Sequence, residues 1–241
     1  MNVLIFQHVA CEHPGQLRSY LRHGGVNWRT VELDEGDAIP SLEEFDALWV
    51  MGGPMDVWQI DKHPWLVAEK EAIRRWVRDL KRPFLGVCLG HQLLADALGG
   101  KCEVSRRPEI GVLDVELTPD GLRDPLFRGM ERTQKVLQWH SVNVVSPPSG
   151  ALVLASSADC AIQAMKVGSC AWSIQYHVEA EADTVENWGA IPAYRDALER
   201  SAGAGSLTML RAAAAEALPS MSRTSKLLYD NFTRAVSLAR V

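Results

Sequence analysis

Residues 83–100, PFLGVCLGHQLLADALGG, place a cysteine where an apolar run gives way to a helical pattern. PFLGV predicts a buried strand, and LGHQLLADAL predicts a helix that Gly99 ends as a left-handed cap. Cys88 therefore lies on the connecting turn, where Gly86 and Gly90 relieve crowding. The first turn of the helix brings unpaired N–H groups and the positive end of its dipole near the sulfur, which favours the thiolate. This pattern predicts a nucleophile more readily than a buried structural cysteine.

A thiol nucleophile needs a base, and histidine supplies one most often. Of the seven histidines, His177 stands out because it follows the apolar run AWSIQY and precedes Glu179 by two residues. A carboxylate there can orient the ring through one nitrogen while the other nitrogen takes the thiol proton. The sequence YHVE thus predicts a base together with its orienting acid.

A second group of chemically capable residues lies just after the first apolar run. His8, Cys11 and His13 are metal-ligating types, but their spacing matches no usual zinc pattern. We therefore predict no metal site and no cofactor.

The first half of the chain alternates short apolar runs with helical patterns. Continuous apolar runs separated by helices are typical of a parallel sheet covered on both faces. The predicted fold class is α/β, a central, mostly parallel, flavodoxin-like sheet flanked by helices. We expect strands near 3–6, 30–33, 47–51 and 83–87, and helices at 15–23 and about 64–80.

From about Cys102 strand-like runs come close together, with turn residues between them. We expect an antiparallel addition to the same sheet, because no flexible linker separates the two halves. After about Glu181 the pattern becomes helical, and the alanine-rich run at 212–218 predicts a helix that stops at Pro219. The predicted organisation is a domain over 1–188 with a helical C-terminal extension over 189–241 packed on it.

Composition narrows the partners. Among 241 residues, 25 basic and 30 acidic side chains give a net charge of −5, without the positive surplus that binds nucleic acid or anionic lipid. No apolar run approaches the roughly 20 residues of a membrane helix. Five cysteines in no framework spacing, and no leader pattern at the start, favour a cytoplasmic protein.

Together these residues resemble the class I (triad-type) glutamine amidotransferase family over roughly residues 1–188. The family has a G-x-C-x-G-x-Q pattern, an H-x-E pattern and an early glycine pair before a proline, and the chain offers all three in the family's order. The matching residues are Gly86, Cys88, Gly90 and Gln92, then His177 and Glu179, and Gly52, Gly53 and Pro54. Val178 stands where many relatives have proline, which bears on the stiffness of that loop.

The resemblance implies hydrolysis of the glutamine side-chain amide. Cys88 would form a γ-glutamyl thioester, with His177 as base and Glu179 as its orienter. The backbone N–H groups of Gly53 and Leu89 would form the oxyanion hole.

The resemblance also implies a substrate wall. Gly52 would let the backbone approach the substrate, and Gln92, one helical turn beyond the nucleophile, would bind the amide. Three residues of QWHSVNV would contact the glutamine α-amino and carboxylate groups: His140, Ser141 and Val142.

The substrate and the acceptor stay open at this point. The chain carries no P-loop and no synthetase domain, so ammonia would pass to a separate synthetase subunit, or the protein would act alone on glutamine or another γ-glutamyl compound. The alternatives are a γ-glutamyl peptidase, which forms the same thioester, and a non-catalytic glutaminase-like binding subunit. Retention of all three residue types disfavours the latter. Homo-oligomerisation is also left open.

Overall fold

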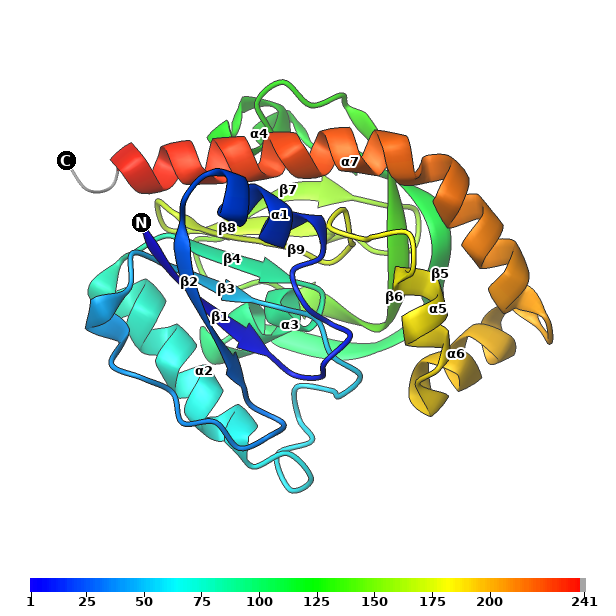
Figure 1. Cartoon of the computed structure of the whole chain (residues 1–241), viewed down its shortest axis with the longest axis horizontal. Helices are drawn as coiled ribbons and strands as arrows, with labels where there is room; N and C mark the ends of the chain where they lie inside the picture. Colours follow the sequence, from blue (N-terminus) through cyan, green and yellow to red (C-terminus); the bar gives the residue numbers. More distant parts are fainter. Residues whose placement is uncertain (239–241) are drawn as a thin grey trace.

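A computed structural model describes residues 1–238, and its centre is one nine-stranded sheet in the order β2-β1-β3-β4-β9-β8-β7-β5-β6 (Figure 1). The strands are β1 Asn2–Gln7, β2 Asn27–Glu32, β3 Ala47–Val50, β4 Phe84–Val87, β5 Lys101–Leu117, β6 Thr133–Ser146, β7 Leu152–Ser156, β8 Ala164–Val167 and β9 Ala171–Ile174. The α-helices are α1 Gln16–His23, α2 Trp65–Arg75, α3 Leu89–Ala97, α4 Pro119–Arg123, α5 Thr184–Gly189, α6 Pro192–Ala202 and α7 Ser206–Leu238. Single turns complete the set: η1 Leu42–Glu44, η2 Trp76–Leu80 and η3 Pro125–Phe127.

The sheet has a parallel half and an antiparallel half. Strands β2, β1, β3, β4 and β9 are parallel neighbours, whereas β8, β7, β5 and β6 extend the sheet by antiparallel pairing. The predicted α/β class with an antiparallel addition is therefore confirmed. The last strand in sequence, β9, returns to the middle of the sheet and pairs with β4. Two segments almost ninety residues apart thus become neighbours.

Helices cover both faces of the parallel half (Figure 1). Successive side chains of a strand point to opposite faces, and the buried residues divide accordingly. Leu4, Leu48 and Phe84 pack in a cluster with residues of α2 and α3, whereas Ile5 and Trp49 pack with residues of α1 and α7. Strands β1, β3, β4 and β9 are buried on both faces, which requires continuous apolar runs, whereas the edge strand β2 is largely exposed.

Helix α7 corrects one sequence prediction, because it continues through Pro219 to Leu238. A proline inside a helix removes one hydrogen bond and crowds the preceding turn, at a cost of about 3 kcal/mol. Burial along the helix offsets that cost. Ala217 and Met221, next to the proline, pack in one hydrophobic cluster, and Phe232, further along, packs against the sheet in another. The helix is bent along its length (Figure 1), as helices with an internal proline commonly are. Tertiary packing therefore overrides the local stop signal.

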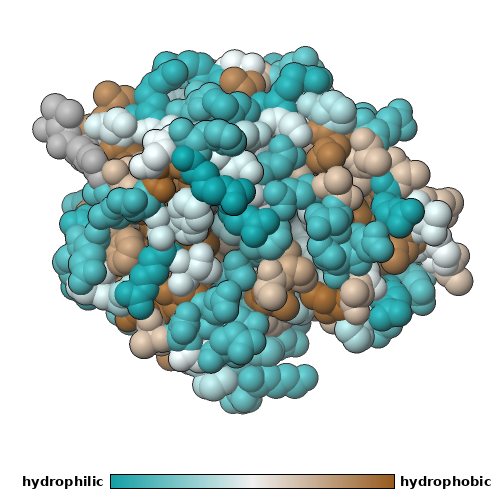
Figure 2. Space-filling view, in the orientation of Figure 1, coloured by the Kyte–Doolittle hydropathy of each residue, from teal (hydrophilic) through white to brown (hydrophobic). Residues whose placement is uncertain are grey.

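The surface is mixed in character. Figure 2 shows hydrophilic and hydrophobic residues interspersed over the face that carries α1 and α7. In the described part of the chain, no helix combines the length and the apolar character needed to cross a membrane.

The absence of a side chain at Gly90 allows α3 to pack closely on the sheet. A Cβ on Gly90 would run into the backbone carbonyl of Val50 at the end of β3. We expect Gly90→Ala to lower the free energy of unfolding by about 1–3 kcal/mol, because α3 must move away from the sheet. Chemical denaturation measures the loss. Gly150→Asn, at a left-handed turn with open space around it, is the control; an equal loss in both variants would contradict this account.

Candidate active site

The predicted site residues meet at one edge of the sheet. In parallel strands the carboxyl ends lie on the same side, where ligands of open α/β sheets bind. The loops after β1, β3, β4 and β9 all leave from this edge. They carry Glu12, Gly53, Cys88 and His177 in turn.

Cys88 occupies a strained turn between β4 and α3. Its φ of 53° and ψ of −106° are unusual for a residue with a side chain, and such a conformation costs on the order of 1–3 kcal/mol. Its N–H donates to the carbonyl of Ile174 at 2.9 Å, and its carbonyl accepts from the N–H of Gln92 at 3.2 Å. Cys88 as a whole is only 5% exposed. The surrounding backbone thus fixes the sulfur at the sheet edge, as the sequence pattern predicts.

Gly86 and Gly90 are required by contact with each other. A Cβ on Gly86 would lie 2.5 Å from the carbonyl oxygen of Gly90. Gly90 N–H in turn donates to the carbonyl of Met51 at 3.1 Å, which ties the start of α3 to the loop after β3. The two glycines therefore let β4, α3 and this loop converge around Cys88.

His177 and Glu179 form a buried pair. His177 Nδ1 lies 2.6 Å from Glu179 Oε1, and Glu179 Oε2 accepts from the N–H of Val178 at 3.0 Å. Backbone hydrogen bonds in both directions join His177 to Leu137 of β6. The carboxylate thus fixes the ring with Nδ1 protonated, which leaves Nε2 for proton transfer.

The electrostatics of His177 suit an acid–base group. Burial by itself lowers the pKa of His177, but the Glu179 carboxylate and the Cys88 sulfur outweigh it and raise that pKa well above its usual range. Within residues 1–238, Nε2 has no partner with hydrogen-bond geometry. The Glu179 carboxylate thus occupies Nδ1, and the Cys88 sulfur acts on the same ring.

The two predicted oxyanion donors belong to neighbouring residues. Leu89 opens α3, where N–H groups lack an intrahelical acceptor. A Cβ on Gly53 would lie 2.9 Å from a methyl carbon of Leu89, so these residues are neighbours. Within residues 1–238, neither N–H donates an intramolecular hydrogen bond. The two residues are thus neighbours, and their N–H groups are unpaired within the described chain.

His8 has a role that the sequence did not suggest. Its Nδ1 lies 2.8 Å from the carbonyl oxygen of Gly52, and its Nε2 lies 2.8 Å from Glu69 Oε1. Trp65 stacks on the ring with centroids 5.5 Å apart. Both ring nitrogens face oxygen atoms, and Glu69 and the Gly52 carbonyl outweigh burial, so the pKa of His8 is raised. His8 thereby fixes the loop that carries Gly53. Among the described residues, no three His, Cys, Asp or Glu side chains form a group that could hold a metal ion.

The His8–Glu69 pair predicts a pH-dependent stability. A raised pKa in the folded state means that stabilisation is complete below the unfolded value of about 6.5 and is lost as the pH rises through the folded value. We expect Glu69→Gln to lower the free energy of unfolding by about 3 kcal/mol near pH 6, since it leaves a buried cation unpaired. The difference in the free energy of unfolding between wild type and Glu69→Gln should become smaller as the pH rises. Denaturation curves at several pH values measure it.

The control for this pair is Glu71→Gln on the same helix, where an exposed glutamate pairs with Arg74. Surface pairs contribute at most about 1 kcal/mol. If wild type and Glu69→Gln differ in the free energy of unfolding by the same amount at every pH, His8 is not the titrating group.

Glu12 and Tyr194 are site residues that sequence reasoning missed. The carboxyl group of Glu12 lies against Gly52, where it leaves no room for a Cβ, and it accepts a hydrogen bond from the hydroxyl of Tyr194. Burial raises the pKa of Glu12 and outweighs the nearby positive charge of His177. Gly52 thus accommodates a carboxyl group of this protein, besides the substrate contact that the resemblance implies. The available signal was an acid just after the first strand, at the same edge as Cys88.

The predicted substrate wall is brought together in part. Gln92 is buried, and its amide donates to the carbonyl of Val142 at 3.1 Å and to Gln175 Oε1 at 3.2 Å. His140 is also buried, with Nδ1 3.2 Å from the same carbonyl, while Ser141 between them is half-buried. Gln92, His140 and Val142 thus form one network between α3 and β6. Their contact with a substrate stays a prediction.

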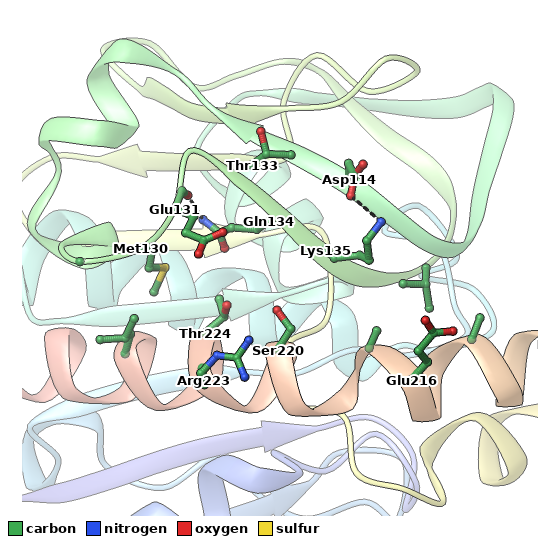
Figure 3. Close-up of a pocket in the computed structure, with 15 residues that line it drawn as sticks. Asp114, Met130, Glu131, Thr133, Gln134, Lys135, Glu216, Ser220, Arg223 and Thr224 are labelled. Carbon is green, nitrogen blue, oxygen red and sulfur yellow. Dashed lines mark hydrogen bonds and ion pairs between the residues drawn. The ribbon is translucent and has the colours of Figure 1, made fainter.

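A large cavity lies elsewhere, between α7 and the β5–β6 ribbon (Figure 3). It measures about 830 Å³, and Asp114 pairs with Lys135 at its rim. Neither Cys88 nor His177 lines it, so it is separate from the site at the sheet edge. Its polar lining includes Thr133, Gln134, Lys135, Glu216, Ser220 and Arg223.

The fold and the site define a class. A cysteine on a strand-to-helix elbow, beside a buried His–Glu pair, is the arrangement that nucleophilic cysteine chemistry requires. Residues 15–187 match the family model for glutamine amidotransferase class-I. The chain therefore belongs to the class I glutamine amidotransferase family.

Individual relatives agree with this assignment. The chain is 33% identical over 153 residues to a subunit of the glutamine-hydrolyzing GMP synthase of Sulfolobus acidocaldarius, covering 63% of this chain and 76% of the relative. It is 32% identical over 192 residues to the putative glutamine amidotransferase-like protein YfeJ of Salmonella typhimurium, covering 77% and 79%. The crystal structure of a glutamine amidotransferase from Thermotoga maritima superposes with a TM-score of 0.83 at 28% identity, over 98% of each chain.

Proposed function

We propose that this protein hydrolyses the side-chain amide of glutamine to glutamate and ammonia through a thioester on Cys88. One observation carries the proposal: the strained Cys88 elbow adjoins the buried His177–Glu179 pair and the two unpaired N–H groups. Nucleophile, base, orienter and oxyanion donors are the parts that acyl transfer needs.

In the first half-reaction the Cys88 sulfur attacks the γ-carboxamide carbon, and the thiol proton is held on His177. The carbonyl oxygen takes the negative charge and accepts hydrogen bonds from the N–H groups of Gly53 and Leu89. Each such donor contributes about 3–4 kcal/mol in a site that excludes water. His177 then gives its proton to the amide nitrogen, the C–N bond breaks, and ammonia leaves a γ-glutamyl thioester.

In the second half-reaction water attacks the thioester carbon while His177 Nε2 takes a proton from it. The C–S bond breaks, glutamate leaves, and the proton returns to the cysteine–histidine pair. Glu179 stays ionised throughout and holds the ring. The two steps together consume one glutamine and one water.

We further propose that the predicted wall residues hold the glutamyl portion of the substrate. Gln92 and Val142 already contact each other, and His140 shares the same carbonyl. Ser141 of β6 and Gly52 of the loop after β3 would add contacts.

The destination of the ammonia is also a proposal. Several relatives are named as one of the subunits of a glutamine-hydrolyzing GMP synthase, which supports transfer to a separate synthetase subunit in the cytoplasm. We propose that residues 1–188 form the amidotransferase domain and that 189–241, of which the structure describes 189–238, are an extension whose described part packs on it. Contacts of α7 with α1, α5, β5 and β6 support this division.

Incubation of the purified protein with glutamine tests the proposal, with ammonia and glutamate measured together. A glutamine analogue with a reactive ketone in place of the amide, 6-diazo-5-oxonorleucine, should label Cys88 even where turnover is slow. Release of equal ammonia and glutamate, or labelling confined to Cys88, supports the function. If the protein neither releases ammonia and glutamate nor is labelled at Cys88, the proposal is wrong. Preferred cleavage of γ-glutamyl peptides would favour the peptidase alternative.

A further inference from the structure

Tyr194 extends from the C-terminal helices into the reaction site. It lies on α6, beyond the family match at 15–187, and is only 8% exposed. Its ring packs against Trp139 and Trp188, with centroids 5.8 Å and 6.0 Å away. Trp188 in turn lies 4.5 Å from the ring of His177. An aromatic layer from α5 and α6 therefore covers His177.

The hydroxyl of Tyr194 is anchored on Glu12. This hydrogen bond joins residues 182 positions apart and is buried. The other carboxyl oxygen of Glu12 faces Gly52, next to the predicted oxyanion donor of Gly53. The charged groups facing Glu12 are His177, Glu179 and His8. The Glu12–Tyr194 pair therefore lies on the His177 side of the sulfur.

The two ends of a γ-glutamyl amide must lie on different sides of Cys88. The leaving nitrogen takes its proton from His177, so it must lie beside that ring. The glutamyl portion belongs beside Gln92, whose side chain contacts Val142 and Gln175. In the described chain neither Glu12 nor Tyr194 hydrogen-bonds to any of these three, whereas Glu12 lies close enough to His177, and Tyr194 to Cys88, for their charges to interact. The pair is therefore on the side of the leaving group.

We propose that Glu12 and Tyr194 are specificity-determining residues that wall the leaving-group side and restrict the substrate to a primary carboxamide. This inference rests on the proposed function. Ammonia as leaving group needs no space beyond the amide nitrogen, whereas an N-substituted amide needs the volume that the Tyr194 ring fills. The carboxyl group of Glu12, held in place by Tyr194, accepts a hydrogen bond from the primary amide. A secondary amide loses one N–H and collides with the ring.

The test compares glutamine with γ-glutamylmethylamide and γ-glutamylglycine, using the full chain. In Tyr194→Ala the ratio of kcat/KM for the larger amides to kcat/KM for glutamine should rise by roughly 10-fold or more, the effect of opening a pocket by about one group. Tyr194→Phe keeps the ring and should change the ratio little. Glu12→Ala should raise it to a lesser degree, because it frees the Tyr194 hydroxyl.

Tyr229→Ala is the matched control. Tyr229 also lies in the C-terminal helices and is equally buried, but it packs on Tyr20 of α1. The Tyr229→Ala variant should be destabilised as Tyr194→Ala is. Its ratio of kcat/KM for the larger amides to kcat/KM for glutamine should not change. A merely structural role for Tyr194 would give the two variants the same ratio.

A second measurement does not depend on turnover. Alkylation of Cys88 by iodoacetamide and by the bulkier N-phenylmaleimide is followed by mass spectrometry of the Cys88 peptide, which separates it from the other four cysteines. Tyr194→Ala should raise the rate ratio of bulky to small reagent by roughly 10-fold or more. Unchanged ratios in both measurements, or wild type that cleaves γ-glutamylglycine as well as glutamine, would overturn the inference. Inert wild type with a responding alkylation ratio would instead count against the proposed function alone.

Discussion

Replacement of Cys88 by alanine is expected to abolish glutamine hydrolysis, with a fall in kcat on the order of a millionfold, which reaches the background of the assay. No other described cysteine can take over the attack. Cys11 is tied through its carbonyl to Trp188, and burial raises the pKa of its thiol to about 11. Burial likewise raises the pKa of the Cys102 and Cys160 thiols to about 12. Ammonia release at high enzyme concentration measures the loss.

The fold of the variant must be checked separately, because Cys88 is strained. Alanine inherits the positive φ of 53°, whereas glycine adopts it without penalty. We expect Cys88→Gly to be as inactive as Cys88→Ala and no less stable in chemical denaturation. Persistent ammonia release in either variant would refute the thioester mechanism.

We expect Glu179→Gln to lower kcat by about 10⁴-fold. The two side chains have the same shape, so the N–H of Val178 can keep an acceptor. An amide group cannot stabilise a charged imidazole as a carboxylate does, and its NH₂ group can favour the wrong tautomer of His177.

The same substitution predicts a shift in the pH profile. Glu179 raises the pKa of His177, so its loss lowers that pKa. Departure of ammonia needs the protonated ring, so the basic limb of kcat should move to lower pH in Glu179→Gln. Glu181→Gln is the control, since Glu181 pairs with Arg18 outside the site. An unmoved basic limb would show that His177 does not supply the proton.

The elbow is the part of this site that the sequence predicts best. Strand, turn and helix follow one another within residues 83–100, and their signals are local: an apolar run, small residues and a helical pattern. His177 and Glu179 are likewise two residues apart. The structure has each of these elements where the pattern predicts it.

Other features depend on residues far apart along the chain, and no periodicity in the sequence predicts them. The His8–Glu69 bond spans 61 positions and the Tyr194–Glu12 bond spans 182. Each joins loops or helices that meet only after the sheet has formed. The stop predicted at Pro219 was wrong for the same reason, since burial of both halves of α7 outweighs a local preference.

The sequence by itself determined the α/β class, the antiparallel addition and the residue types of the predicted nucleophile, base and orienter, because these follow from short-range patterns. Only the tertiary structure decided that β9 pairs with β4, so that Val87 lies beside Ile174 and Cys88 comes next to His177. It also decided that a tyrosine from the C-terminal helices covers this site. Strand pairing and side-chain burial are cooperative over the whole chain, so no local stretch encodes them alone.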